Sequence, residues 1–143
     1  MSETGTPVTP TWFEPVEAAR ATLVAAAYQS ATRQAAEDQI DQAMRDARRA
    51  LARQPDHVEG LLQLAIATGY SAKLHRAPGA AREARALMER ALARDPDNPF
   101  AWAALGGWHG ETVATLGGFL AGLTLGARKA EALRYYEGAL VRD

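Results

Sequence analysis

The chain has 143 residues, of which 48% are hydrophobic and 23% charged, and this length and composition suit one globular domain with a buried core. Its formal net charge of −1 gives no electrostatic reason to expect a nucleic acid or an anionic membrane as the main partner. The chain contains no cysteine, which excludes disulfides, thiolate nucleophiles and cysteine-ligated zinc, and fits the cytoplasmic location that we expect unless an export signal has been removed.

The N-terminal residues are polar and contain threonine, serine, glycine and proline. Residues 1–14 carry no positively charged segment of the signal-peptide type, so we predict a flexible leader. A single helical domain is expected over residues 15–143, because alanine is abundant and β-branched and aromatic residues are sparse. The domain divides into three antiparallel helix pairs, over residues 15–54, 57–94 and 99–142.

The first pair begins at Pro15, whose fixed backbone angle suits the first turn of a helix. Apolar residues then recur at helical spacing, at Val16, Ala19, Leu23, Ala26 and Ala27. A second helix is predicted over residues 34–53, with apolar residues at Ile40, Ala43, Met44, Ala47 and Leu51. No strong helix breaker separates the two helices. We place a turn near residues 30–34 only because two helices must be separated by a turn to pack as an antiparallel pair.

Proline and glycine mark the limits of the middle pair. Pro55 ends the second helix, and Asp56 can cap a third helix over residues 57–74. The loop signal over residues 77–79, which read Ala-Pro-Gly, precedes a fourth helix over residues 80–94.

The last pair follows a second proline-rich stop, with Asn98 as the helix cap and Pro99 at the first helical position. The fifth helix runs from there past Trp108 and is expected to reach Thr124, before a final helix over residues 127–142. Six helices in three pairs are therefore predicted, and the pairs must stack because none can bury its apolar face alone.

A recurring phrase marks the end of the second helix of each pair. Residues 50–56 read ALARQPD and residues 91–97 read ALARDPD, and an incomplete third copy, ALVRD, occupies residues 139–143. The copies are separated by 41 and then 48 residues. Recurrence at such a period is typical of helical repeat arrays, which usually bind partners rather than perform chemistry.

The last pair carries a recognisable residue pattern. Trp102, Leu105, Gly106 and His109 lie on its first helix, and Ala132 and Tyr136 lie on its second. This pattern resembles the tetratricopeptide repeat (TPR) family, whose consensus is W-x2-L-G-x2-Y followed by A-x3-F, with His109 in place of the tyrosine. The middle pair matches more weakly, at Leu61, Leu64, Ala65, Ala84, Met88, Ala91 and Pro96, and the first pair only in its second helix, at Ala43, Ala47, Ala50 and Pro55. The resemblance covers roughly residues 38–143 and implies an all-α, short right-handed solenoid.

The repeats are longer than the 34 residues of that family, and the 7 and 14 extra residues fall between the two helices of a pair. Seven residues make nearly two helical turns and rotate a helix face by only about 20°. We therefore expect lengthened helices, and long hairpins that project from one edge of the solenoid.

The TPR resemblance implies a concave face made by the first helix of each pair. Its residues would be Glu59, Leu62, Ile66, Gly69 and Tyr70 in the middle pair, and Phe100, Ala103, Gly107, Gly110 and Glu111 in the last pair. TPR modules that bind a C-terminal carboxylate place Lys, Asn and Arg on this face, whereas here the equivalent positions are apolar residues and glycine. The resemblance therefore implies an apolar groove for a helix or an extended peptide, unless an N-terminal or a further C-terminal helix already fills it.

Residues 112–127 form a glycine-rich segment of sixteen residues without a charge. It is too short and too interrupted by glycine for a membrane span, which needs about 20 apolar residues. Gly118, Gly122 and Gly126 lie one turn apart and favour close approach of another helix. The segment, which includes Phe119, is the buried tip of a hairpin, a contact surface for a partner or second subunit, or a patch that faces lipid.

No catalytic or metal-binding pattern occurs in the sequence. His57, His75 and His109 show no metal-ligand spacing, and His109 is expected to pack in place of the consensus tyrosine. We find no phosphate-binding glycine loop, no nucleophile elbow and no suitable pair of carboxylates, so we expect no enzyme, no metal and no cofactor.

The sequence thus predicts a non-catalytic interaction module or scaffold that docks a protein or peptide on the concave face or on the glycine-rich hairpin. A protein of another class stays open, in which a small molecule or lipid binds an apolar pocket near Trp108 and Phe119. Self-assembly as a homodimer is the third interpretation, because the end of an array leaves an apolar face unpaired.

Overall fold

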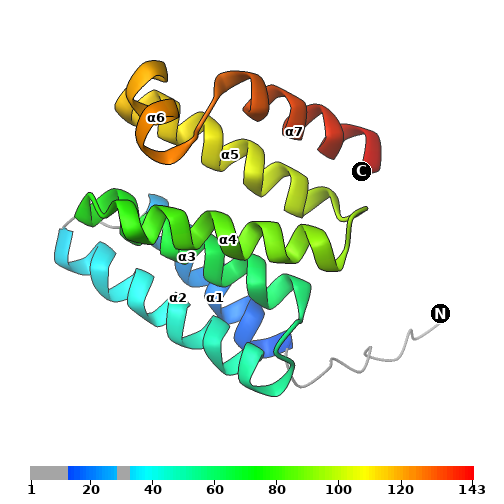
Figure 1. Cartoon of the computed structure of the whole chain (residues 1–143). Helices are drawn as coiled ribbons and strands as arrows, with labels where there is room; N and C mark the ends of the chain where they lie inside the picture. The colour runs from blue at the N-terminus through cyan, green and yellow to red at the C-terminus, as the bar shows by residue number, and fades with distance from the viewer. Residues whose placement is uncertain (1–12, 29–32) are drawn as a thin grey trace, which may run out of the picture.

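The computed structural model describes residues 13–28 and 33–143, and these residues form seven α-helices and no strand. The helices are α1 (Phe13–Tyr28), α2 (Arg33–Arg53), α3 (Val58–His75), α4 (Pro78–Arg94), α5 (Pro99–Leu116), α6 (Gly118–Leu125) and α7 (Lys129–Arg142). The all-α class and the helical repeat array are confirmed (Figure 1). Residues 1–12 of the predicted leader and residues 30–32 of the predicted turn lie outside the described residues.

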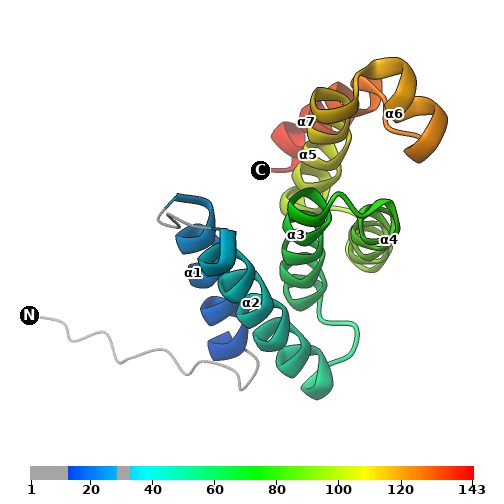
Figure 2. The same cartoon turned by 90° about the vertical axis from the view of Figure 1, so that its left-hand side faces the viewer.

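The helices pack as three consecutive pairs, α1 with α2, α3 with α4 and α5 with α7 (Figure 1). Each second helix also packs on the first helix of the next pair, so that α2 contacts α3 and α4 contacts α5. In Figure 2, α1 and α4 lie on opposite sides of α3. The chain therefore buries its apolar residues between successive pairs as well as within them.

The last pair differs from the prediction. The fifth helix ends at Leu116 instead of reaching Thr124, and a separate short helix, α6, follows it. The break lies at Gly117, whose φ of 82° is unfavourable for any residue with a Cβ atom. Because α3 and α5 both have 18 residues, the extra length of the last pair lies in α6 and its connections. The three predicted pairs are present, but the expected continuation of the fifth helix to Thr124 is wrong, and α6 is an additional short helix.

The caps of α3 and α5 explain where these helices begin. Asn98 accepts hydrogen bonds through Oδ1 from the backbone N–H groups of Phe100 at 2.9 Å and Ala101 at 3.3 Å, as predicted. At the start of α3 the cap is His57 rather than the expected Asp56, because its Nδ1 accepts the N–H of Gly60 at 3.3 Å. The side chain of Asp56 instead forms an ion pair with Arg90 of α4.

Small residues set the spacing of the helices within the middle and last pairs. A Cβ atom at Gly69 would lie 3.9 Å from Cβ of Ala84, and one at Gly110 would lie 3.9 Å from Cβ of Ala132. The two glycines are 41 residues apart and the two alanines 48, which are the repeat distances of the sequence. The same close approach of a first and a second helix therefore recurs in both pairs.

Trp102 packs between α5 and α7. A Cβ atom at Gly138 of α7 would lie only 2.5 Å from Cε3 of the indole ring, and the ring of Tyr135 lies 5.6 Å away between centroids. The indole N–H donates to the carbonyl oxygen of Pro96 at 2.7 Å, and the guanidinium of Arg142 lies 4.0 Å from the ring centroid. Trp102 therefore fills space within the last pair.

Candidate partner-binding face

The first helices, α1, α3 and α5, are connected to one another by ion pairs. Arg20 of α1 pairs with Glu59 at the start of α3, and Nζ of Lys73 near the end of α3 lies 3.1 Å from Oε2 of Glu111 in α5. Glu59 and Glu111 were predicted to lie on the partner-binding face, and in the structure each also forms an ion pair within the chain. The sequence did not reveal these pairs because each partner charge comes from a neighbouring repeat.

A mainly apolar strip on α3 and α5 accompanies these ion pairs. We call it the first-helix face, and it comprises Ile66, Tyr70, Phe100, Ala103 and Gly107. Tyr70 and Phe100 are 41% and 66% exposed, whereas the other three residues are half-buried. Exposed aromatic rings are strong candidates for binding contacts, because they bury much apolar surface at little entropic cost.

Two of the predicted face residues have special surroundings. Leu62 is only 2% exposed and belongs to the core, so the structure places it beneath the face rather than on it. A Cβ atom at Gly107 would have its nearest neighbour, the hydroxyl oxygen of Tyr136, at 3.5 Å, which is an ordinary van der Waals contact. The side chain of Tyr136 from α7 therefore reaches the first-helix face at Gly107.

The glycine-rich segment contains three glycines in three different environments. Gly118 opens α6 with no atom within 4 Å of a Cβ position, and Gly122 faces the carbonyl oxygen of Ala127. Gly126 lies beyond the helix with a φ of 70°, which ends α6. The expectation that these glycines follow one another along a single helix is therefore wrong, because α6 stops before Gly126.

The short helix α6 presents leucine side chains to solvent and is held by arginines of α4. Leu120 and Leu123 are 46% and 72% exposed, so α6 is not the buried hairpin tip. Nη2 of Arg82 donates to the carbonyl oxygen of Thr124 at 3.3 Å, and Nη1 of Arg85 to that of Leu125 at 3.2 Å. These carbonyls lie at the C-terminal end of α6, where a helix favours positive charge. The side chain of Phe119, which was predicted to belong to this surface, lies outside the part that the structure describes.

His109 and Trp108 pack in the interior of the last pair. Nδ1 of His109 accepts the backbone N–H of Arg128 at 3.1 Å, and its ring stacks on Tyr135 at 5.7 Å between centroids. Burial, together with the positive charge of Arg85, lowers the pKa of His109 below its usual value, so the ring is neutral near pH 7. Trp108 is 6% exposed, and its indole N–H donates to the carbonyl oxygen of Ala81 at 2.8 Å. The predicted packing role of His109 fits these contacts.

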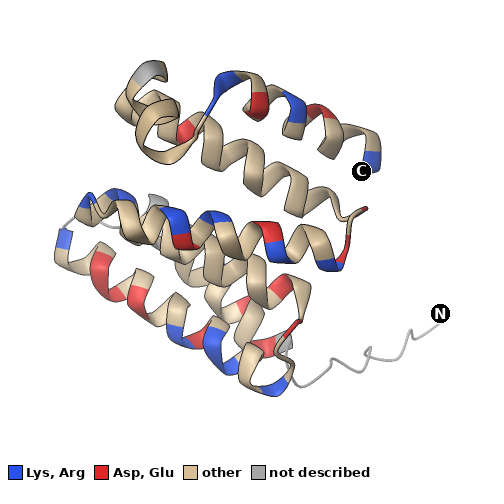
Figure 3. Cartoon of the chain, in the orientation of Figure 1, with Lys and Arg blue, Asp and Glu red and all other residues tan. Residues whose placement is uncertain are grey.

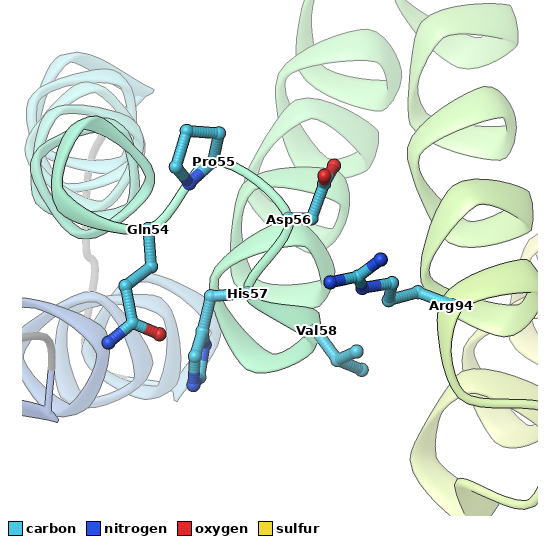
Figure 4. A pocket seen from close by; sticks show the side chains of 6 residues that line it. All are labelled: Gln54, Pro55, Asp56, His57, Val58 and Arg94. Carbon is cyan, nitrogen blue, oxygen red and sulfur yellow. The ribbon is translucent and has the colours of Figure 1, made fainter.

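A shallow depression lies where α2 connects to α3 (Figure 4). It is lined by Gln54, Pro55, Asp56, His57, Val58 and Arg94. None of the predicted site residues lies in it, and its cap and ion-pair contacts are structural. Within the described ranges, no group of three histidine or acidic residues could hold a metal ion.

Charges of both signs are interleaved along α2 (Figure 3). Arg33, the first residue of the helix, pairs with Glu37 at 3.3 Å, and Arg49 pairs with the buried carboxylate of Asp46. Ion pairs at a spacing of three or four residues stabilise a helix from within. These charges of α2 therefore have partners on the helix itself.

A comparison of the sequence with protein-family models agrees with the stacked helix pairs and the recurring contacts between small residues. The family model of the tetratricopeptide repeat matches residues 69–107. Over this segment the chain is related to the TPR family. The match runs from the last turns of α3 through α4 into α5, so it spans the stacking of the middle pair on the last pair. No curated protein and no solved structure gave a significant match to the chain.

The relationship bears on function in general terms. TPR repeats typically lack catalytic activity and mediate protein–protein interactions, so the match supports an interaction module. Of the helices that the structure describes, none is both long enough and apolar enough to cross a bilayer. Because one fold can host many functions, the partner must be argued from the surface itself.

Proposed function

We propose that this chain is a non-catalytic module that docks a helix or an extended peptide of another protein on the first-helix face. The observation that carries the proposal is the exposure of two aromatic rings, Tyr70 at 41% and Phe100 at 66%. Half-buried Ala103 and Gly107 lie along the same helix as Phe100 and present little side-chain bulk. Large rings beside small residues form an uneven surface, and apolar side chains of a partner can pack between the rings.

The chemistry of the face favours an apolar partner. Its five residues carry no charge, and the nearby Lys73 is already paired with Glu111. Recognition of a carboxylate by a cluster of cations is therefore disfavoured, as the sequence also suggested. A peptide with two or three apolar anchors at helical spacing fits better, and its polar residues would meet the flanking ion pairs.

A selection from a displayed peptide library tests the proposal, because the library itself supplies the candidate ligands. Peptides selected on the wild-type chain are measured by fluorescence anisotropy against the double variant Tyr70→Asp/Phe100→Asp. Both positions are exposed, so the variant is expected to keep its far-UV helicity. We expect the affinity to fall by at least about tenfold, because two aromatic contacts are replaced by charges.

The matched control is Leu120→Asp/Leu123→Asp, which places two charges on exposed positions of α6. Selected peptides should bind this variant as they bind the wild type. If instead the α6 variant loses binding and the Tyr70/Phe100 variant retains it, the first-helix face is not the docking site. Docking on the glycine-rich hairpin, the alternative favoured by the exposed leucines of α6, would then take its place.

The small-molecule alternative has less support around Trp108. The ring is 6% exposed, its N–H is engaged, and its faces and edges contact His109 and Arg85. A pocket there would require these contacts to open. The interaction module is therefore the function that the described residues support best.

A further inference from the structure

The short helix α6 exposes leucines within an uncharged segment of the chain. Leu116 at the end of α5 is 38% exposed, and Leu120 and Leu123 of α6 are 46% and 72% exposed. Residues 112–127, which include all three leucines, carry no charge. Exposed apolar residues that gather in one segment, rather than being scattered, indicate a contact surface.

The opposite side of α6 is buried against the rest of the chain. Ala121 is fully buried and Leu125 packs on the core, and these two residues are four apart on the helix. Leu120 and Leu123 are three apart and occupy the other side. Helix α6 packs on α4 and α5 and lies away from α1 and α2 (Figure 1, Figure 2). The two leucines are therefore held outward by an anchored helix.

Positive charges border the exposed side of α6. Nη2 of Arg82 in α4 lies 3.3 Å from the carbonyl oxygen of Thr124, and Arg128 and Lys129 directly follow the segment. All three cations are exposed, and within the described ranges none of them forms an ion pair. Glu83, the neighbour of Arg82 in sequence, offsets one of the three charges, so an excess of two positive charges remains. This end of the chain therefore attracts anions.

The formal net charge of −1 does not describe this end, because acidic residues gather elsewhere. Glu37, Asp38 and Asp41 lie on α2, and Asp95 and Asp97 lie beyond the far end of α4 (Figure 3). The apolar surface of α6 thus coincides with a local positive charge that the whole-chain value conceals.

The hydrogen-bonding groups of α6 favour lipid over a protein as the occupant of this surface. A typical protein interface carries about one hydrogen bond per 100–200 Å². The side-chain hydroxyl on the outer side of α6, that of Thr124, already donates to the carbonyl oxygen of Leu120 at 2.6 Å. Arg82 contacts the backbone of α6, so its charge lies behind the leucine tips. Apolar tips in front of cations match the order of acyl chains and phosphates in a bilayer.

We infer that α6 binds the surface of an anionic lipid membrane, with Leu120 and Leu123 in the outer acyl region and Arg82, Arg128 and Lys129 at lipid phosphates. Apolar burial and attraction to anionic headgroups together hold a helix in the plane of the interface. The helix lies on the membrane and does not cross it. The inference goes beyond the proposed function, because none of these residues belongs to the first-helix face.

Vesicle flotation tests the inference, with vesicles of phosphatidylcholine alone and of phosphatidylcholine with about 30% phosphatidylglycerol in about 0.1 M salt. The wild-type chain should bind the anionic vesicles at least about tenfold more tightly than the neutral ones. Leu120→Asp/Leu123→Asp should weaken this binding by at least about tenfold, because apolar contact is lost and negative charge is added.

The matched control is Leu133→Asp/Leu140→Asp, which makes the same substitutions on α7 leucines that are 55% and 77% exposed. This variant should keep most of the vesicle binding, and far-UV helicity controls for folding in both variants. A control that loses as much binding as the α6 variant overturns the inference. A wild-type chain that binds neither vesicle also overturns it, and would favour a protein partner for the exposed leucines.

Charge removal tests the role of the cations separately. Arg128→Gln/Lys129→Gln should weaken binding to the anionic vesicles by about tenfold, because both cations border α6. Arg48→Gln/Arg94→Gln removes the same charge from exposed positions of α2 and the far end of α4, and should bind as the wild type. An equal loss in both variants would mean that the vesicles respond to net charge alone, which overturns the assignment to α6.

A dye placed at one position reports which helix enters the lipid. The chain contains no cysteine, so Leu123→Cys offers a single site for an environment-sensitive dye such as NBD. On anionic vesicles the dye at this position should shift its emission to the blue, whereas the dye on Leu140→Cys should keep its aqueous spectrum. No shift at Leu123→Cys, or a shift at Leu140→Cys alone, overturns the inference.

Discussion

Gly138 is the residue at which a single methyl group has the sharpest predicted effect. Its Cβ position lies 2.5 Å from the indole of Trp102, which is itself held by the carbonyl of Pro96 and by Arg142. Gly138→Ala should therefore lower the free energy of unfolding by about 1–3 kcal/mol, although alanine is the better helix former. Urea denaturation measures the loss.

Gly79→Ala is the control for that substitution, because nothing lies within 4 Å of its Cβ position in α4. It should stabilise the chain slightly, by at most about 0.5 kcal/mol, because Gly79 lies in the first turn of α4 and not in the helix interior. If both alanine variants were stabilised alike, Trp102 would have to be free to move, and the packing described between α5 and α7 would be incorrect.

His109 makes stability depend on pH in a definite direction. Its pKa is lowered in the folded chain by burial and by Arg85 and Arg134, against the opposing effect of Glu131 and Glu89. The unfolded chain therefore binds more protons between that lowered pKa and 6.5. Stability is fully present above pH 6.5 and falls as the pH drops through this window. Urea midpoints measured at about pH 5 and about pH 7.5 should differ accordingly.

Two histidine variants separate this effect from that of His57, whose pKa is lowered in the same direction, mainly by burial. His57→Asn keeps a cap residue and should retain the part of the pH dependence that His109 causes. His109→Phe keeps an aromatic ring and should lose that part. As the pH falls, the stability of His57→Asn should drop more steeply than that of His109→Phe. The reverse order would assign the pH dependence to His57.

At the scale of the element, helix α6 depends on two arginines from α4. Arg85→Gln removes the charged donor to the carbonyl of Leu125 and the cation that lies 5.0 Å from the centroid of Trp108. Amide hydrogen exchange in residues 118–127 should accelerate by about tenfold, since a charge-assisted contact at the end of a short helix is lost. Mass-spectrometric exchange of the corresponding peptides checks this.

Arg90→Gln is the matched control, because Arg90 also lies on α4 but pairs with Asp56 at the other end of the helix. Exchange in residues 118–127 should then stay at the wild-type rate. An equal acceleration in both variants would mean that α6 responds to the overall stability of α4 and not to its own anchoring contacts.

The elements also show where prediction from the sequence succeeds and where it fails. The boundaries at Asn98 and Pro99 were predictable, because capping and the φ of proline act within a few residues. The break at Gly117 was not, since glycine permits both helical and positive φ values and the choice depends on how α6 packs on α4. The pairing of Glu59 with Arg20 and of Glu111 with Lys73 likewise depends on stacking between repeats. The exposure of the residues on the first-helix face therefore depends on this stacking and could not be predicted from the residue pattern.

At the scale of the whole molecule, the repeat organisation predicts that stability is local to each pair. Leu64 of α3 and Leu105 of α5 occupy equivalent positions 41 residues apart, and both are buried, at 8% and 0% exposed. Each substitution to alanine should cost about 2–5 kcal/mol, because each leaves a cavity in the core. In an array whose pairs contact only their neighbours, the damage is largest in the pair that carries the substitution.

Leu105→Ala should therefore accelerate hydrogen exchange in α5 and α7 more than in α2, and Leu64→Ala should accelerate it most in α3 and α4. The contrast follows from the contacts, since α7 packs on α5 and not on α2. Comparing the same peptides in both variants cancels differences in intrinsic exchange rate. The contrary result is that both substitutions accelerate hydrogen exchange in every helix by one common factor. The three pairs would then unfold as one unit, because contacts between pairs would stabilise the fold as much as contacts within them.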